Sequence, residues 1–469
     1  MHLRRLTLVS LAAPFLFVAC SSDNGARGRS GVQATGPGAP GDQTTSDLQP
    51  SGAAGTGGVV AAGGSEGQGT DLPLQPSDMG PVAPLGTVEN RGSGCEVAAL
   101  PPGNTLPMSP NLPDPFTRLD GSRISQKSDW VCRRQEILKQ AYQYIYGEKP
   151  QKPDSVSGTV TSTEVTVNVQ QGGQSASFTA SITLPAGDGP FPAVISFSGS
   201  GPVQQIADQG VAVINFAQGS VGSRNSGMFA TFYPGNSAGD LAAWAWGASR
   251  IVDVLQSADN TIIDAKRLGV TGCSFLGKAA FATGALDERF VLTIPLESGI
   301  GGVPSYKIVP QLEPNPTNDG QGPEQPQHAI NNGWLPSSSL VASFQQLPID
   351  THEIIGLVAP RGLLVLGNTG TQGQYYKNLD FRSEYATAIA GKEIYTALGF
   401  ADSMSYDSRA VNHCQNTDRF TAAVQASVGR FLLNNGSTTG TFTTDWEDVR
   451  VPPDQWKDWT APTLEGDLP

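Results

Sequence analysis

Hydrophobic residues follow two patterns in the chain beyond about residue 91. Alternating apolar and polar positions over 160–169 and 176–184 predict strands of a half-exposed sheet. Short apolar runs at 193–197 and 211–216 are typical of buried parallel strands. Further strands are predicted at 268–272, 291–296, 363–366 and 404–411. Helical spacing of apolar residues predicts helices at 135–146, 240–255, 277–285, 382–398 and 418–433. Strands that alternate with helices after an antiparallel start indicate an α/β domain over 91–469, a three-layer αβα sandwich.

Residues 1–19 have neither pattern and read as an export signal. Arg4 and Arg5 precede a mostly apolar run that is too short to span a bilayer. The run ends in Val-Ala-Cys, and this resembles the cleavage box of a bacterial lipoprotein, with Cys20 as the lipid acceptor. Ordinary signal cleavage is the alternative, because Phe17 stands where that box usually has Leu.

Residues 20–90 predict a disordered linker between the signal and the domain. From residue 21 to residue 90 the chain contains no Phe, Trp, Tyr or Lys and is mainly Gly, Ala, Ser, Thr, Pro, Gln and Asp. Such a composition buries too little apolar surface to offset the entropy lost on ordering. We expect a flexible tether that separates the domain from a membrane.

Composition and charge exclude one class of partner. The 469-residue chain has a formal net charge of −13, and it offers no basic footprint for a phosphate backbone. We therefore expect no nucleic-acid binding, and contact with a membrane only through the lipid anchor.

A candidate nucleophile lies at a predicted strand-to-helix turn, where residues 272–278 read Gly-Cys-Ser-Phe-Leu-Gly-Lys. A tight turn there would expose the Ser274 hydroxyl above the sheet edge. The backbone N–H of Phe275 would point to where an oxyanion forms, as in α/β-hydrolases. In the usual motif, G-x-S-x-G, the second glycine stands one residue earlier than Gly277. A Gly-Ser turn without chemistry is the alternative.

The candidate base is a histidine near the end of the domain. Three histidines lie beyond the signal, namely His328, His352 and His413. The α/β-hydrolase order along the chain is serine, acid, histidine, with the histidine after the last strand. His413 follows the predicted strand 404–411, so its position favours it, and we expect structural roles for the other two.

Glu297 is the favoured acid, because it directly follows the predicted strand 291–296 and so lies at the same sheet edge. The usual position of the acid is after the next strand, 363–366, but no carboxylate occurs there before Asp380. A surface carboxylate at a strand end is the alternative for Glu297.

Two of the five cysteines flank these candidates, since Cys273 precedes Ser274 and Cys414 follows His413. Disulfides persist in the oxidising space outside the cell, and a Cys273–Cys414 bridge would tie the two loops together. A second bridge would join the remaining cysteines of the domain, Cys95 and Cys132. Two free buried thiols are the alternative. A zinc site is disfavoured because no Cys-x-x-Cys or Cys/His ligand spacing occurs.

The chain from about residue 95 to residue 464 resembles the glucuronoyl esterases, carbohydrate esterase family 15. The matching stretches are 112–116, 120–122, 243–247, 270–278, 293–299, 347–350, 356–362 and 412–414. The resemblance implies a serine esterase that cleaves esters between (4-O-methyl-)glucuronic acid of glucuronoxylan and lignin alcohols. It implies Ser274 as nucleophile, His413 as base and Glu297 as acid, and the Cys273–Cys414 type of bridge also occurs in the family. An acyl-enzyme mechanism of this kind requires no metal and no organic cofactor.

The resemblance also assigns residues around the substrate. Lys278 matches a lysine that contacts sugar hydroxyls. Gln325 and Asn331 align with a sugar-binding glutamine and glutamate, and Tyr376 or its neighbour Tyr375 stands in for a tryptophan over the sugar. The family motif G-C-S-R-x-G-K has an arginine that stabilises the oxyanion, where this chain has Phe275. Loss of one oxyanion donor typically lowers the rate by about 10²–10³.

These departures leave two alternatives to the main hypothesis. One is a serine esterase with altered acyl or uronate specificity, and the other is a surface carbohydrate-binding protein with a weakened site. For either function we expect a monomer in a bacterial cell envelope, lipid-anchored or secreted. We expect Trp446, Trp456 and Trp459 to pack the C-terminal tail on the domain rather than to form a sugar platform.

Overall fold

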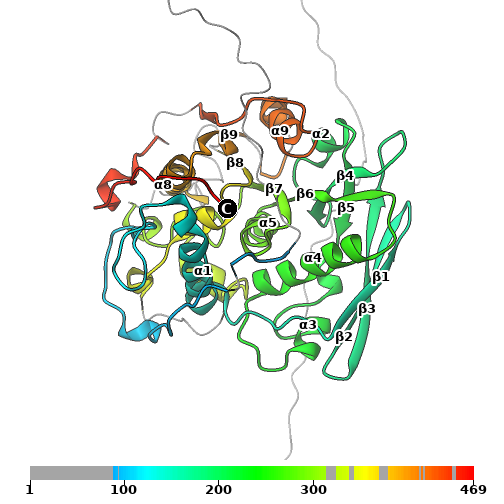
Figure 1. Ribbon diagram of the computed structural model, residues 1–469, viewed down its shortest axis with the longest axis horizontal. Coiled ribbons are helices and arrows are strands. Elements are labelled where there is room, and N and C mark those ends of the chain that lie inside the picture. The colour runs from blue at the N-terminus through cyan, green and yellow to red at the C-terminus, as the bar shows by residue number, and fades with distance from the viewer. Residues whose placement is uncertain are drawn as a thin grey trace, which may run out of the picture. The chain divides into compact units, whose positions relative to one another are not determined.

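A mixed β-sheet forms the centre of the domain in the computed structural model (Figure 1). The structure describes residues 88–92, 94–312, 324–336, 343–368, 379–410, 413–415, 418–445 and 450–469. All of these belong to the unit Pro73–Pro469. The predicted signal, Cys20 and nearly all of the predicted linker lie outside the described residues.

The sheet has ten strands among the described residues, in the order β1-β2-β3-β5-β4-β6-β7-β8-β9-β10. Their bounds are β1 Ser155–Val160, β2 Glu164–Gln171, β3 Gln174–Thr183, β4 Phe191–Phe197, β5 Ala212–Phe216, β6 Ile263–Cys273, β7 Phe290–Leu296, β8 Gly362–Asn368, β9 Met404–Ala410 and β10 Phe442–Thr443. Pairings from β1 to β5 are antiparallel, and those from β5 to β10 are parallel. The change follows the sequence, because alternation gives way to continuous apolar runs where both faces are covered.

Helices cover both faces of the sheet, and their bounds are α1 Trp130–Ala141, α2 Val203–Ala207, α3 Gly227–Phe232, α4 Asp240–Ser257, α5 Phe275–Leu286, α6 Pro326–Asn331, α7 Thr351–Val358, α8 Phe381–Leu398 and α9 Asp418–Phe431. Helices α2 and α9 pack on one face (Figure 1) over a cluster that includes Val194, Ile294 and Phe420. The remaining long helices pack over the larger cluster on the other face. This arrangement is the three-layer αβα sandwich of an α/β-hydrolase, so the predicted fold class is confirmed.

The structure corrects two element boundaries and adds one helix. The alternation over 160–169 belongs to two strands, β1 and β2, because Thr161 closes a turn by hydrogen bonds to Glu164. The helix expected at 135–146 begins earlier, at Trp130, and winds into a π-helical turn after Ala141. Helix α7 was not predicted, although Asp350 and Glu353 form a capping box at its start.

The C-terminal tail packs on the domain through buried tryptophans. Trp456 and Trp459 are 5% and 6% exposed. The Trp459 Nε1–H donates to the Leu112 carbonyl at 3.0 Å, and its ring lies against Phe116 and His352. These two residues therefore form no exposed platform, whereas Trp446 lies outside the described residues.

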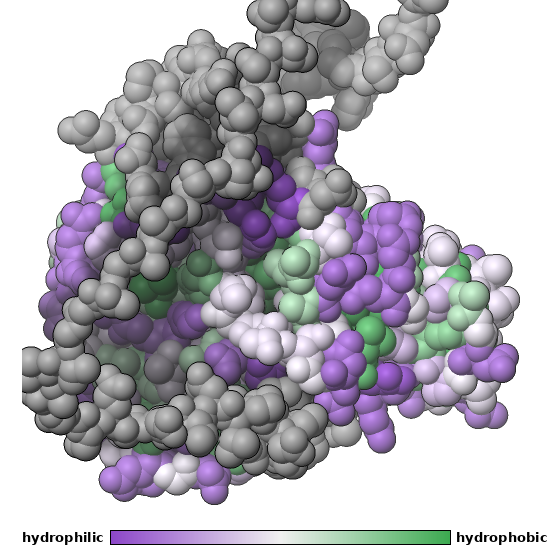
Figure 2. Space-filling view, turned by 90° about the horizontal axis from the view of Figure 1, so that it is seen from above, coloured by the Kyte–Doolittle hydropathy of each residue, from purple (hydrophilic) through white to green (hydrophobic). Residues whose placement is uncertain are grey.

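Hydrophilic residues cover much of the outer described surface in Figure 2, and hydrophobic residues gather in a hollow near its centre. The large hydrophobic side chains that are exposed in the described part of the chain are Val88, Met108 and Phe275. Within the same residues, no helix combines the length and the apolar character needed to cross a lipid bilayer.

Candidate active site

Ser274 occupies a strained turn between β6 and α5. Its φ is +60° and its ψ is −129°, a conformation that costs a non-glycine residue free energy and recurs at catalytic turns. The Ser274 N–H donates to the Leu296 carbonyl at 2.9 Å. The hydrogen bond holds the turn against the end of β7, where the neighbouring candidate Glu297 begins.

Two glycines make this turn possible. A Cβ atom at Gly272 would lie 2.3 Å from the Leu276 carbonyl oxygen, and one at Gly277 would lie 2.5 Å from the Leu296 carbonyl oxygen. Both distances are too short for any side chain. Gly277 therefore allows α5 to pack closely against the end of β7, although its spacing in the motif is unusual.

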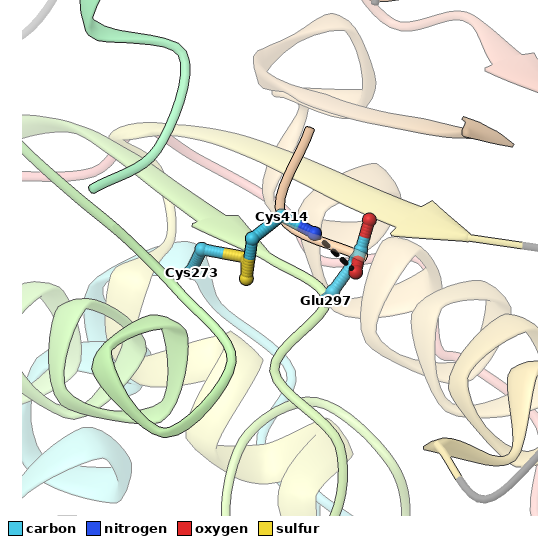
Figure 3. A group of neighbouring side chains, drawn as sticks. All are labelled: Cys273, Glu297 and Cys414. Carbon is cyan, nitrogen blue, oxygen red and sulfur yellow. Dashed lines mark hydrogen bonds between the residues drawn. A yellow bond between two sulfur atoms is a disulfide. The ribbon is translucent and has the colours of Figure 1, made fainter. Parts of the chain in front are cut away.

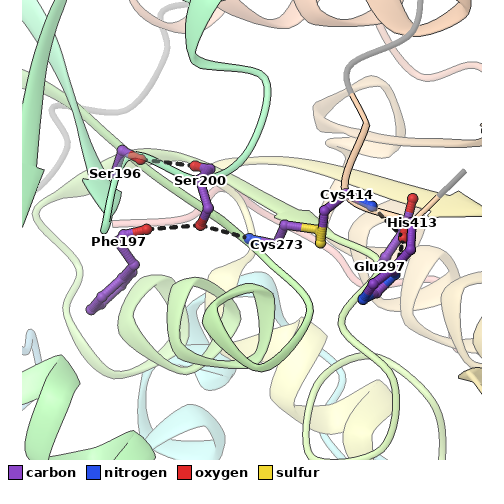
Figure 4. Close-up of a disulfide and its surroundings, with 7 residues drawn as sticks. All are labelled: Ser196, Phe197, Ser200, Cys273, Glu297, His413 and Cys414. Carbon is purple, nitrogen blue, oxygen red and sulfur yellow. Dashed lines mark hydrogen bonds and ion pairs between the residues drawn. A yellow bond between two sulfur atoms is a disulfide. The ribbon is translucent and has the colours of Figure 1, made fainter. Parts of the chain in front are cut away.

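Glu297 extends from the end of β7 with φ +49° and is 1% exposed. Its N–H donates to the Leu366 carbonyl at 2.7 Å, so the loop leaves β7 beside the end of β8. Its Oε2 accepts hydrogen bonds from His413 Nδ1 at 2.5 Å and from the Cys414 N–H at 3.0 Å (Figures 3 and 4).

His413 lies in the segment 413–415 that follows β9, and its side chain is 28% exposed. Because Nδ1–H is donated to Glu297, the neutral ring carries its lone pair on Nε2, the nitrogen that a general base uses. The buried carboxylate can also stabilise the imidazolium that forms when Nε2 takes a proton.

The Cys273–Cys414 disulfide joins the two loops, with a distance of 5.6 Å between its Cα atoms (Figure 4). Because its cysteines adjoin Ser274 and His413, it holds both candidates at the same sheet edge. The second predicted bridge, Cys95–Cys132, is also present. Cys273, Glu297 and Cys414 form the one cluster of potential metal ligands in the described part of the chain, but its two sulfur atoms are bonded to each other and offer no thiolate.

Lys278 lies one turn after Ser274 on α5 and is 2% exposed. Its Nζ donates to the Ser298 carbonyl at 2.7 Å and to Glu324 Oε2 at 2.9 Å, and it stands 4.6 Å from the centroid of the Trp334 ring. Burial lowers the pKa of Lys278, whereas the Glu324 carboxylate opposes this shift.

Glu324 and Trp334 were missed by the sequence reasoning, although both adjoin residues that it chose. Glu324 also accepts the Ile300 N–H at 3.1 Å, which fixes it beside the loop after β7. The signal in the sequence was a carboxylate directly before Gln325, but only the fold brings it 46 residues back to Lys278.

The other predicted substrate contacts are exposed or lie outside the described residues. Gln325 precedes α6 and is exposed. Asn331 ends the same helix, is exposed, and accepts a hydrogen bond from Gln327 at 2.9 Å. Tyr376 lies outside the described residues.

Phe275 places its ring in an aromatic cluster beside the candidate nucleophile. The ring lies 6.1 Å from that of Trp244 and 6.2 Å from that of Trp334, parallel to the latter within 2°. It is 37% exposed. As the first residue of α5, Phe275 has a backbone N–H without an acceptor within the helix, in the position expected for an oxyanion donor.

Comparisons of sequence identify relatives of one kind. A family model described as fungal glucuronyl esterase matches residues 167–399. The chain is 38% identical over 401 residues to a 4-O-methyl-glucuronoyl methylesterase from Thermothelomyces thermophilus, covering 82% of this chain and 96% of the relative. It is 34% identical over 386 residues to the enzyme of the same name from Hypocrea jecorina, covering 79% and 80%.

Comparisons of structure agree with those of sequence. The glucuronoyl esterase catalytic domain from Hypocrea jecorina superposes with a TM-score of 0.68 at 33% identity, covering 78% of this chain and all of that domain. A serine-to-alanine mutant of the Sporotrichum thermophile glucuronoyl esterase, in complex with methyl 4-O-methyl-β-D-glucopyranuronate, gives 0.70 at 35% identity and covers 79% and 100%.

Proposed function

The chain belongs to the glucuronoyl esterase family, carbohydrate esterase family 15, and on that premise we propose that it hydrolyses esters between (4-O-methyl-)glucuronic acid of glucuronoxylan and lignin alcohols. It is a carboxylic ester hydrolase, like its relatives named 4-O-methyl-glucuronoyl methylesterase. The observation that supports the assignment most directly is the contact between Glu297 and His413, tied by a disulfide to the strained Ser274 turn.

The proposed chemistry is acyl transfer in two steps. His413 takes the proton of the Ser274 hydroxyl, and the oxygen attacks the uronate carbonyl carbon. The tetrahedral oxyanion accepts a hydrogen bond from the Phe275 N–H and lies at the positive end of α5. His413 then protonates the leaving alcohol, and water releases the uronate from Ser274 with His413 again as base.

Replacement of the nucleophile tests this proposal. We expect Ser274→Ala to lower kcat/KM on benzyl glucuronate by about 10⁴-fold or more, because the acyl-enzyme cannot form. Ser157→Ala, on the exposed edge strand β1, is the matched control and should keep the parent rate. Equal rates for Ser274→Ala and the parent chain would overturn the proposal.

Recognition of the uronate is proposed to involve Lys278, with Glu324 holding its ammonium group in place. The contact between Lys278 and Glu324 supports a fixed position for that amine. Roles for Gln325, Asn331 and Tyr376 in binding the sugar stay predictions.

The second candidate function, a serine esterase with altered acyl specificity, is favoured by the Phe275 ring. An arginine at this position could stack its guanidinium on Trp244 or Trp334 and donate to the oxyanion. If a missing donor limits uronate esters, Phe275→Arg should raise kcat on benzyl glucuronate about tenfold. An unchanged kcat, together with a preference of the parent for acetate esters over glucuronate and galacturonate esters, would favour the second candidate.

Export and anchoring are proposed from residues 1–20, while the relatives named above come from fungi. The disulfides of the domain are typical of proteins in an oxidising compartment. We propose lipidation of Cys20 in a bacterial envelope, with a monomeric domain. Labelled fatty acid should enter the parent chain but not Cys20→Ser, and equal labelling of the two would contradict the anchor.

A further inference from the structure

A cluster of buried carboxyl groups lies behind the proposed catalytic acid. Glu297, Asp380 and Glu384 are 1%, 3% and 1% exposed, and they come from the end of β7 and the start of α8. One oxygen of each, Glu297 Oε1, Asp380 Oδ2 and Glu384 Oε1, lacks a hydrogen-bond partner among the described residues. Buried carboxylate oxygens without partners are costly, so this cluster requires an explanation.

Glu384 reaches the catalytic edge across β8. It lies in the first turn of α8, and a Cβ atom at Gly367 would lie 2.4 Å from its Oε1. Gly367 directly follows Leu366, whose carbonyl accepts the Glu297 N–H at 2.7 Å. The Glu384 carboxyl therefore lies beside the strand end that holds Glu297.

The two glutamates differ in their partners. Glu297 Oε2 accepts hydrogen bonds from His413 Nδ1 and from the Cys414 N–H. The charged groups that face Glu384 are Glu297 and Asp380, which are both acidic, and the phenol of Tyr406 on β9 faces it as well. No ion pair with a cation is formed by Glu384 among the described residues.

Burial decides which carboxyl holds a proton. It raises the pKa of Glu384 to about 8; a hydrogen bond with the Tyr406 phenol opposes this shift, and the charges of Glu297 and Asp380 add to it. Burial also raises the pKa of Asp380 to about 6, and a hydrogen bond from the Ser383 N–H opposes that shift. At neutral pH, Glu384 is thus a neutral acid with an O–H group to donate.

We propose that Glu384 is a positioning residue whose protonated carboxyl donates a hydrogen bond to Glu297 Oε1, the oxygen that neither His413 nor Cys414 uses. This bond fixes the orientation of Glu297 toward His413 and keeps a second negative charge away from the pair. The inference rests on the proposed function in one respect, the role of Glu297 as the acid.

Two variants of Glu384 distinguish the effect of its hydrogen-bond donor from the effect of its side-chain volume. Glu384→Gln keeps the shape and an amide donor, and should retain kcat within about threefold. Glu384→Met fills a similar volume without a donor, and should lower kcat about 10- to 100-fold at unchanged KM, the rate equivalent of one hydrogen bond to a charged group. Glu353→Gln, at a buried glutamate of α7 paired with Arg133, is the matched control and should leave kcat unchanged.

The pH profile gives a readout that a merely structural role would not move. In the parent chain, kcat should fall as pH rises through about 8, because Glu384 loses its proton and places a second charge beside Glu297. Glu384→Gln should lack this step and Glu353→Gln should keep it. A step near pH 8 in Glu384→Gln, or parent-like kcat in Glu384→Met, would overturn the inference.

A spectroscopic measurement distinguishes failure of the inference from failure of the proposed function. The infrared difference spectrum between the parent and Glu384→Gln should show a protonated carboxyl at pH 7 that disappears by about pH 9. If the band is present but no glucuronate ester is hydrolysed, the proton assignment stands and the proposed function fails. If the esters are hydrolysed and the band is absent, the inference alone fails.

Discussion

Two regions of the molecule contain the same kinds of residue and differ in what those residues can do. The proposed catalytic edge comprises Ser274, Glu297, His413 and the Cys273–Cys414 disulfide. The α1–α7 seam comprises Arg133, His352, Glu353, Trp459 and the Cys95–Cys132 disulfide. Each region has a histidine, a buried glutamate and a disulfide.

The glutamates differ in their permanent partners. Glu353 is paired with the Arg133 guanidinium at 2.9 Å, and this permanent cation opposes the rise of the Glu353 pKa to about 8 that burial causes. Glu297 instead faces a histidine, and its charge is balanced only when that ring is protonated. A carboxylate that faces a histidine, as Glu297 does, can stabilise a transient imidazolium. A carboxylate that is already paired with an arginine, as Glu353 is, cannot.

The histidines differ in access to solvent. His352 is fully buried, stacked on the Trp459 ring at 5.7 Å, with Nε2 at 2.9 Å from the Pro113 carbonyl. The His413 side chain is 28% exposed at the sheet edge. Residue type alone therefore does not identify a catalytic base; an accessible nitrogen and a buried acid together do.

The largest expected effect on activity comes from replacing each of the two histidines separately. We expect His413→Gln to lower kcat/KM on benzyl glucuronate by about 10³-fold or more, with little change in the free energy of unfolding. His352→Gln should keep kcat/KM within a few-fold but lower the free energy of unfolding by about 1–3 kcal/mol. Ester kinetics and urea unfolding on both variants check the contrast, which disappears if both lose activity equally.

The two disulfides offer an intermediate effect. Each Cys→Ser pair should destabilise the fold by about 2–5 kcal/mol. The Cys273/Cys414 pair should cost about 1 kcal/mol more in the chain-entropy model, because it closes 141 residues rather than 37.

Only the Cys273/Cys414 pair should also lower kcat, by about tenfold, because it positions Ser274 against His413. Urea unfolding and ester kinetics on the two double variants separate stability from positioning. If kcat falls equally in both, the Cys273–Cys414 bridge has no special role at the catalytic edge.

The smallest expected effect is the pH dependence of stability from the seam. Burial lowers the pKa of His352 to about 4, below the value of about 6.5 in an unfolded chain. As pH falls from about 6.5 to 4, the unfolded chain binds a proton that the native chain does not. The free energy of unfolding should therefore fall by up to about 3 kcal/mol over this range.

Urea unfolding at several pH values, compared with His352→Gln, isolates this contribution. The variant should lose less stability on acidification than the parent over the same range. Equal acid dependence in the two chains would show that His352 does not titrate as the buried geometry requires.

Much of the fold could be predicted because local patterns and global layers agree. The change from alternating to continuous apolar runs marks where the sheet becomes covered on both faces, as at β4 and β6. Helix α7 was not predicted because it has only eight residues, all of them buried, and so short a buried segment is hard to recognise as a helix from its pattern. The capping box at Asp350 was a signal that could have found it.

The candidate site likewise contains residues that the sequence could predict and residues that it could not. Ser274 and Glu297 directly follow β6 and β7, and His413 comes soon after β9, so the order of elements along the chain predicts their sheet edge. Glu324 and Trp334 lie in segments between elements, and nothing local relates them to Lys278. Both residues contact Lys278 because the segments that contain them fold back against α5.

The sequence by itself determined the layers, the chain order of the proposed nucleophile, acid and base, and the four cysteines that can bridge, because these follow from periodicity and from residues close to strand ends. The tertiary structure alone decided which groups meet at short range. It placed Glu324 on Lys278, the Phe275 ring beside Trp334, and Glu384 behind Glu297. Contacts of this kind depend on side chains from distant segments converging within a few ångströms, which no local pattern encodes.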